Sequence, residues 1–464
     1  MKFFRFIEKA FRNLLPSPFS IAIILTVLTF TIAFLATEGK SSGFGHVKEL
    51  LGYWEKGLWD APNLAFSVQM MLMLVLGHVL ALTKPVDTFI SHVTQYCNST
   101  ASSATIVTSL TVLVALFNWG LGLIFGAILA RKVGEHAARK RIPLNYPLIG
   151  AAGYSGLMVW HGGISGSAPI KAAENEHVRS LMGGVFNPDQ LELLPSSYSF
   201  SETIFGSMNL VVMVLLMVLL PFFMYWLGKR SNKVTSLPEI EKSDSSDSES
   251  EGLKGAERLD VSRWFALLIG GLIAAYSIST AIDLFPSKGF GFINPNYINL
   301  LLLGLGLLLH SSVQSFLKSI DQAIGGSAGI LIQFPLYFGI LGIMKHSGLV
   351  EQMSDFFAQN STATSFPILT FFSSGLVNIF VPSGGGQWLI QGPVIVKAAM
   401  ELGVSVPKAI MALSYGDQIT NMLQPFWALP LLGITGLKAR QILPYTFALM
   451  LVGSFIFIAA LLIF

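Results

Sequence analysis

Cysteine and charge are both scarce in this chain. Cys97 is the single cysteine among 464 residues, so no disulfide can form within the chain. The eight histidines are not clustered with it at the spacing of a zinc site. Charged residues make up 12% of the total, about half the share of an ordinary soluble domain. We therefore expect no cofactor and no nucleic acid partner, and a lipid bilayer as the surroundings.

Hydrophobic residues account for 52% of the chain and gather in runs close to the ~20 residues that cross a bilayer. This predicts an all-α polytopic membrane protein. The first run follows a basic start, Met1 to Arg12, and is longer than the ~7–15 apolar residues of a signal peptide. We therefore expect a first transmembrane helix with a cytoplasmic N-terminus. The predicted spans lie near residues 18–36, 63–82, 147–170, 203–227, 262–284, 297–315, 326–345, 408–434 and 443–463.

The chain contains an internal repeat. The motif Asn-Ser-Thr-Ala that begins at Asn98 returns at Asn360, Tyr154 is matched by Tyr415, and the offset is 261 or 262 residues. Shared apolar composition does not explain the match, because the matched residues are polar, Gly and Pro. Repeats interrupted by Gly and Pro are typical of secondary transporters, whose sites form where broken helices meet.

Two further apolar stretches, 104–130 and 367–398, have breaks at their centres, near residues 118–120 and 382–387. If each crossed the membrane once, the basic loop at 131–141 and the basic pair at 229–230 would lie on opposite sides, against the positive-inside rule. We therefore expect two re-entrant hairpins that enter from opposite faces. The two repeats would then have inverted topology.

This reading divides the chain into three parts. Residues 229–261 are predicted to be a disordered acidic, Ser-rich cytoplasmic linker, with a phosphorylation or partner site as the alternative to a plain tether. The first repeat, 1–228, holds scaffold helices, a hairpin at 98–133 and a broken helix at 147–170. The second repeat, 262–464, holds scaffold helices, a hairpin at 360–400 and a broken helix at 408–434.

The hairpins and broken helices are expected to form the site, because non-helical backbone in a membrane persists only where it lines a cavity or binds something. The candidate substrate-binding residues are Asn118, Trp119, His161, Gly162, Gly163, Ser165, Ser383, Gly384, Gly385, Gly386, Gln387, Trp388, Asn421 and Gln424. The candidates for cation coupling are Asp417, Ser155 and Thr420.

The residue types near the breaks limit the ligand. No Arg lies near any break, so the bidentate clamp that suits a phosphate or a dicarboxylate is missing. Hydroxyl and amide donors surrounded by aromatic residues instead suit one carboxylate with a small apolar tail. The aromatic residues are Trp119, Trp160, Trp388, Phe426 and Trp427.

Asp417 is the one acidic residue expected near the middle of the membrane, where acids are costly and usually functional. It could hold Na⁺ together with neighbouring carbonyls, or exchange a proton. His161 is a second candidate proton carrier, and a structural hydrogen-bonding role is equally open for it.

Three motifs carry a resemblance that spans essentially the whole chain. They are VWHGGISGSAP at 159–169, FVPSGGGQW at 380–388 with QGP at 391–393, and GDQITNMLQPFW at 416–427. In them the chain resembles the bacterial short-chain fatty acid transporter family. The resemblance implies uptake of small monocarboxylates such as acetoacetate or butyrate. With Asp417 as the coupling residue, we expect a cation-coupled symporter in the cytoplasmic (inner) membrane. Membership of the wider ion transporter superfamily implies scaffold and transport domains, and often homodimers that move by an elevator mechanism.

Other functions fit less well. A membrane-embedded enzyme with His161 and Asp417 as an acid–base pair lacks a nucleophile, a metal-ligand spacing and a cofactor motif. Hairpins from opposite faces favour an occluded site over an open channel. A C4-dicarboxylate or other organic-anion carrier is disfavoured by the absent Arg. We therefore expect a transporter and no enzymatic activity.

Overall fold

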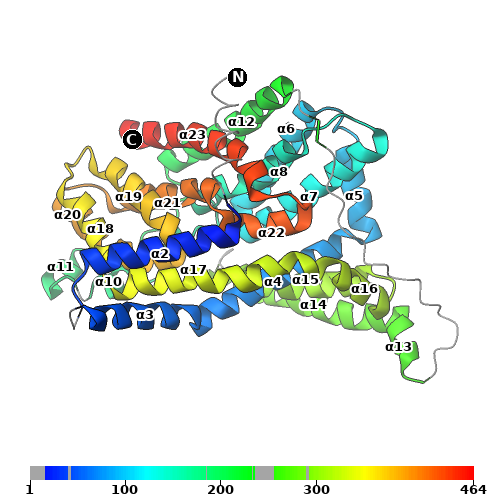
Figure 1. The fold of residues 1–464 in the computed structure, drawn as a ribbon, viewed down its shortest axis with the longest axis horizontal. Coiled ribbons are helices and arrows are strands. Elements are labelled where there is room, and N and C mark those ends of the chain that lie inside the picture. Colours follow the sequence, from blue (N-terminus) through cyan, green and yellow to red (C-terminus); the bar gives the residue numbers. More distant parts are fainter. Residues whose placement is uncertain (1–15, 40–42, 184, 232–233, 236–254, 289–291) are drawn as a thin grey trace.

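A computed structural model describes residues 16–39, 43–183, 185–231, 234–235, 255–288 and 292–464. Within these ranges the chain is all-helical (Figure 1). The helices of the first half are α2 (Pro18–Ala36), α3 (Phe44–Leu58), α4 (Ala61–Ala81), α5 (Lys84–Thr94), α6 (Thr100–Phe117), α7 (Trp119–Lys140), α8 (Tyr146–Tyr154), η1 (Ser155–Met158), η2 (Trp160–Gly162), α9 (Ser167–Ala173), α10 (His177–Met182), α11 (Pro188–Glu192) and α12 (Ser207–Arg230). Those of the second half are α13 (Glu257–Val261), α14 (Arg263–Lys288), α15 (Pro295–Leu309), α16 (Val313–Ala323), η4 (Ile324–Ser327), α17 (Ala328–His346), α18 (Leu349–Gln359), α19 (Phe366–Phe380), α20 (Gly384–Glu401), α21 (Val406–Thr420), η5 (Asn421–Leu423), α22 (Pro425–Thr435) and α23 (Ala439–Ile463).

Several helices are long and apolar enough to cross a membrane. Seven such spans occur in the described part of the chain: 18–36, 61–81, 100–117, 207–230, 263–287, 313–346 and 439–463. The outward faces of α12 and α14 carry many exposed large apolar side chains, as a lipid-facing surface requires. The prediction of an all-α polytopic membrane protein is therefore confirmed.

The two stretches with central breaks form helical pairs. The first pair is α6 and α7, joined at Asn118, and the second is α19 and α20, joined by residues 381–383. Asn118 and Ser383 each cap the second helix of their pair by accepting a hydrogen bond from the backbone N–H three residues later. The first pair is longer than the predicted hairpin of residues 98–133, because α7 runs on to Lys140.

The first pair packs against the end of α12. Gly228, near the end of α12, lies directly on Ala101 at the start of α6. Ser207, at the start of α12, lines a cavity together with Ser405, the residue that precedes α21. Entry of the two hairpins from opposite faces stays a prediction.

Both predicted broken helices are interrupted. The first changes from α8 into the 3₁₀ turns η1 and η2 and resumes as α9. The second breaks at η5, because Pro425 has no N–H to donate to the Asn421 carbonyl. Asp417 therefore lies in the last turn of α21 and not at the break. The hydroxyl of Tyr154 donates to the Asn421 carbonyl oxygen at 2.8 Å. A residue of the first broken helix therefore supplies the hydrogen bond that Pro425 cannot give to this carbonyl.

The repeat partner of Tyr154 has a matching role. The Tyr415 hydroxyl donates to Asn209 Oδ1 at 2.9 Å, and Asn209 Nδ2 donates to the Gly162 carbonyl oxygen at 2.8 Å. Each tyrosine thus supports the break of the other repeat, one directly and one through Asn209. These bonds fix both breaks in the interior of the molecule.

The acidic core of the predicted linker, residues 243–251, lies outside the described residues. The described flanks are partly helical, against the prediction of disorder: Lys229 and Arg230 end α12, and Glu257–Val261 forms α13. The division into two repeats around this linker stays a prediction.

Candidate substrate and coupling site

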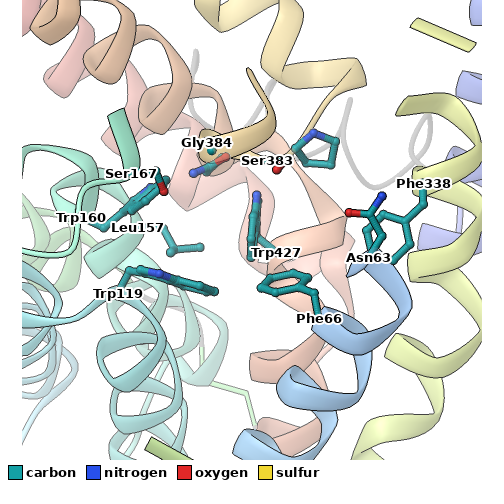
Figure 2. A pocket seen from close by; sticks show the side chains of 13 residues that line it. Asn63, Phe66, Trp119, Leu157, Trp160, Ser167, Phe338, Ser383, Gly384 and Trp427 are labelled. Atoms are coloured by element: carbon teal, nitrogen blue, oxygen red, sulfur yellow. The ribbon is translucent and has the colours of Figure 1, made fainter. Parts of the chain in front are cut away.

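A cavity of about 270 Å³ lies between the tips of the two helical pairs and the two broken helices. Its volume falls below the ~300–1,000 Å³ of sites for drug-sized ligands, so it suits a small molecule. Figure 2 shows Trp119 and Phe66 below this space and the turn at Ser383 and Gly384 above it. The lining residues are Asn63, Phe66, Trp119, Leu157, Trp160, Ser167, Phe338, Pro382, Ser383, Gly384, Gly385, Asn421 and Trp427.

The start of α20 presents free backbone donors to the cavity. Ser383 Oγ accepts from the Gly386 N–H at 3.2 Å, and the Ser383 carbonyl accepts from the Gln387 N–H at 2.7 Å. The N–H groups of Gly384 and Gly385 form no hydrogen bond with any described residue. Because α20 has 18 residues, its macrodipole adds a positive end to these two donors. This tip is an anion-binding arrangement.

Trp160 adds a third free donor. Its side chain is 5% exposed, it lines the cavity, and its Nε1–H has no partner among the described residues. A buried N–H left unpaired costs about 1–3 kcal/mol, so such groups usually serve a ligand or a bound water. The Trp160 ring stacks on the His161 ring with centroids 4.3 Å apart.

His161 and Asp417 form a buried pair directly behind the α20 tip. His161 Nδ1 lies 2.5 Å from Asp417 Oδ2, and the two residues are 0% and 1% exposed. His161 Nε2 accepts a hydrogen bond from the Ala168 N–H at 3.0 Å. The Gln418 side-chain oxygen accepts from the His161 backbone N–H at 2.8 Å. Two hydrogen bonds to the ring and one to the backbone N–H therefore hold His161 in one orientation.

Glycine at position 384 allows this close approach. A Cβ there would lie 2.7 Å from the Trp160 ring, 3.0 Å from His161 Cε1 and 3.3 Å from Asp417 Oδ2. The α20 tip, the indole and the buried pair are therefore in direct contact. By contrast, a Cβ on Gly385 would meet no atom within 4 Å.

The tip of the first pair is closed by hydrogen bonds. Asn118 Oδ1 accepts from the Leu121 N–H at 3.0 Å, and Asn118 Nδ2 donates to the Ile293 carbonyl at 3.1 Å. The Trp119 N–H donates to Ser165 Oγ at 2.9 Å. Ser165 and Asn118 thus position Trp119, which is the residue of this tip that lines the cavity.

The structure brings some of the predicted site residues together and separates others. Trp119, Ser383, Gly384, Gly385 and Asn421 line the cavity, and His161 lies behind it. Gln387 points into its own helical pair, where Nε2 donates to the Ser374 carbonyl and to Gln391 Oε1. The Trp388 indole N–H donates to His177. The remaining predicted residues, which pack around the cavity without lining it, are Gly162, Gly163, Gly386 and Gln424.

Six lining residues were absent from the prediction. Leu157, Ser167 and Pro382 belong to interrupted segments, so the breaks themselves were the available signal. Asn63 and Phe66 on α4 and Phe338 on α17 lie in uninterrupted helices. Nothing in the sequence distinguishes these three from other helix residues that pack in the interior.

Of the residues proposed for cation coupling, Asp417 and Thr420 meet through Asn378, whose Nδ2 donates to the Asp417 carbonyl oxygen and to Thr420 Oγ1. Sodium would need several oxygen atoms, whereas an imidazole nitrogen occupies Asp417 Oδ2. The Ser155 hydroxyl donates to the Ala152 carbonyl, and Thr420 Oγ1 accepts from Asn378 Nδ2. No hydrogen bond joins either hydroxyl to the Asp417 carboxylate in the described structure.

Comparison with known proteins gives a consistent result over the full length. The model of the family described as short chain fatty acid transporter matches residues 2–464. A protein of Escherichia coli K12, provisionally named a short-chain fatty acid transporter, is 37% identical over 464 residues, which covers 99% of each chain. A protein of Haemophilus influenzae with the same provisional name is 35% identical over 466 residues, covering 98% of each chain.

Two solved structures were also matched. The YdaH transporter of Alcanivorax borkumensis gives a TM-score of 0.44 at 16% identity, with 97% of each chain covered. The MtrF protein of Neisseria gonorrhoeae, described as illuminating a class of antimetabolite efflux pumps, gives 0.41 at 13% identity, with 99% of this chain and 96% of that chain covered.

Proposed function

Because the chain belongs to the short-chain fatty acid transporter family, we propose that it is a secondary active symporter of small monocarboxylates such as butyrate or acetoacetate. It is a multi-pass membrane transporter and not an enzyme. The observation that carries the choice of substrate is that the free N–H donors of Gly384 and Gly385 lie at one small cavity, beside Trp160, whose buried Nε1–H has no partner among the described residues.

The donors suit a single carboxylate. A carboxylate has only acceptor sites, and the α20 tip and the indole offer only donors. No Lys or Arg lines the cavity, so a second carboxylate would have no cation to pair with. A C4-dicarboxylate is therefore a weaker candidate than a monocarboxylate.

The rest of the lining suits a short apolar tail. Phe66, Trp119, Leu157, Phe338 and Trp427 form a mostly apolar wall opposite the donors. Burying each methylene of the acid contributes about 0.8 kcal/mol until the chain fills the space. Affinity should therefore rise from acetate to butyrate and fall for acids that are too long.

Alternating access follows from where the cavity lies. Its walls come from both helical pairs and both breaks, so a movement of these elements relative to α4 and α17 would open it to either side. This proposal places the N-terminus in the cytoplasm of a bacterial inner-membrane protein, with a homodimer as the expected assembly. Cysteines introduced at His136 and Asn360 should then be labelled from opposite faces. Labelling from the same face would contradict the inverted arrangement.

Uptake of labelled butyrate into proteoliposomes tests the function. Protein-free vesicles are the control, because short acids also diffuse through lipid. We expect saturable uptake that unlabelled acetoacetate and butyrate inhibit and that succinate does not. Saturable uptake of succinate with no effect of butyrate would overturn the proposal.

A further inference from the structure

The hydrogen bonds of His161 fix the position of its ring proton. A backbone N–H can only donate, so the Ala168 N–H bonded to Nε2 requires a lone pair on that nitrogen. The ring proton is then on Nδ1, where it donates to Asp417 Oδ2. His161 is therefore neutral, and the pair carries a net charge of −1 when Asp417 is ionised.

No other charge compensates this pair. The elements that pack against η2 and α21 are α6, α9, α19, α20, α23, η1 and η5. These elements and α21 carry few titratable groups besides the pair itself. Tyr415 donates to Asn209, and Lys171 is ion-paired with Glu174. Lys397 is half-exposed and lies near Glu401. Lys408 lines a separate cavity, Tyr445 accepts from Asn145, and Arg440 is exposed. None of these groups forms a hydrogen bond or ion pair with His161 or Asp417 in the described structure.

The substrate's negative charge would bind close to this pair. The position of a Cβ on Gly384 is 3.3 Å from Asp417 Oδ2. A carboxylate held by the Gly384 N–H would therefore be a near neighbour of the Asp417 carboxylate, and like charges that lie close together disfavour each other. One added proton makes the pair neutral and removes that repulsion.

We propose that the coupled cation is a proton shared by His161 and Asp417, an inference that rests on the proposed function. The proton adds to the Asp417 carboxylate, since Nε2 is engaged by Ala168. One proton and one monocarboxylate enter the site from the same side, and both are released to water on the other side. The cycle therefore moves no net charge and needs no sodium.

Calorimetry on the purified full-length chain in detergent tests the stoichiometry. Butyrate is titrated in two buffers of different ionisation enthalpy, and the difference in heat gives the number of protons taken up per butyrate. We expect close to one proton. Because binding and protonation are reciprocally linked, the Kd should rise about tenfold per pH unit once the free pair has lost its proton. Adding NaCl in place of KCl should leave the Kd unchanged.

Asp417→Asn separates this role from a structural one. The amide keeps the size of the side chain and much of its hydrogen bonding but removes the charge and the proton. The variant should bind butyrate with no proton uptake and with a Kd that no longer depends on pH. Asp87→Asn is the matched control, because Asp87 pairs with Lys132 near the surface, and it should retain one proton per butyrate.

The outcomes distinguish the two proposals. If the parent protein binds none of the short acids, the proposed function fails. If it binds butyrate with no proton uptake, or if its affinity requires Na⁺, the proton inference is overturned while the function stands. Full proton uptake by Asp417→Asn would also overturn it. Should that variant not purify as a single species, the proton count of the parent protein decides alone.

Discussion

The tips of the two helical pairs are built alike, but they differ in whether their backbone N–H groups are hydrogen-bonded within the protein. At each tip a polar residue, Asn118 or Ser383, caps the following helix. In the first pair, Asn118 and the Trp119 N–H are bonded to Ile293 and Ser165. In the second pair, the N–H groups of Gly384 and Gly385 are free. We therefore interpret the first tip as a support and the second as the binding surface of the proposed site.

The difference shows that an interrupted hairpin does not by itself make a site. An exposed helix N-terminus attracts an anion only where no protein group has already taken its donors. At the first tip, the Ser165 hydroxyl, from the first broken helix, accepts the hydrogen bond of the Trp119 N–H. At the second tip, the cavity lies between the helix start and the broken helices. Three experiments test this contrast.

The largest effect is expected from Gly384→Ala. Its Cβ would press on the Trp160 ring and on His161, so the α20 tip must move away from both. We expect butyrate uptake to fall at least about 100-fold, since misplacing a binding group by about 1 Å has effects of that size. The control is Gly120→Ala at the first tip, where the Cβ meets the flexible end of Met73 at 2.9 Å. A larger loss in the control would reverse the roles of the two tips.

A smaller effect is expected from Trp160→Phe, which keeps a ring and removes the N–H. A hydrogen bond to a charged group contributes about 1.5–3 kcal/mol, so the KM for butyrate should rise at least about tenfold with little change in protein yield. Trp388→Phe is the matched control, because the Trp388 N–H is already bonded to His177 and lies away from the cavity. Equal KM values in the two variants would show that the Trp160 N–H does not reach the substrate.

The smallest effect is expected from removing the caps. Asn118→Ala loses the bond to Leu121 and the bond to Ile293, and should cost about 2 kcal/mol of stability. Ser383→Ala loses one bond, to Gly386, and should cost about 1 kcal/mol. Thermal unfolding in detergent should therefore show a larger drop in melting temperature for Asn118→Ala. The opposite order would mean that the second tip is the structural one.

Sequence patterns located the elements of the site well but not the orientation of its side chains. The breaks near 118, 155–166, 383 and 421 could be predicted because Gly, Pro and Asn interrupt apolar runs there. Gln387 was an obvious candidate by composition, yet the first turn of α20 directs it toward Ser374. Which face of a new helix points to the cavity depends on its packing partners, which one sequence does not reveal.

The sequence alone determined the membrane class, the internal repeat, the missing cationic clamp and the importance of Asp417, because charge, hydrophobicity and helix-breaking residues are local properties. Only the tertiary structure decided that Asp417 meets His161, a residue 256 positions away in the chain. It also decided that α4 and α17 contribute Asn63, Phe66 and Phe338 to the cavity, and that Trp160 is left with a free donor. These facts arise from contacts between distant segments, which form only when the helices pack.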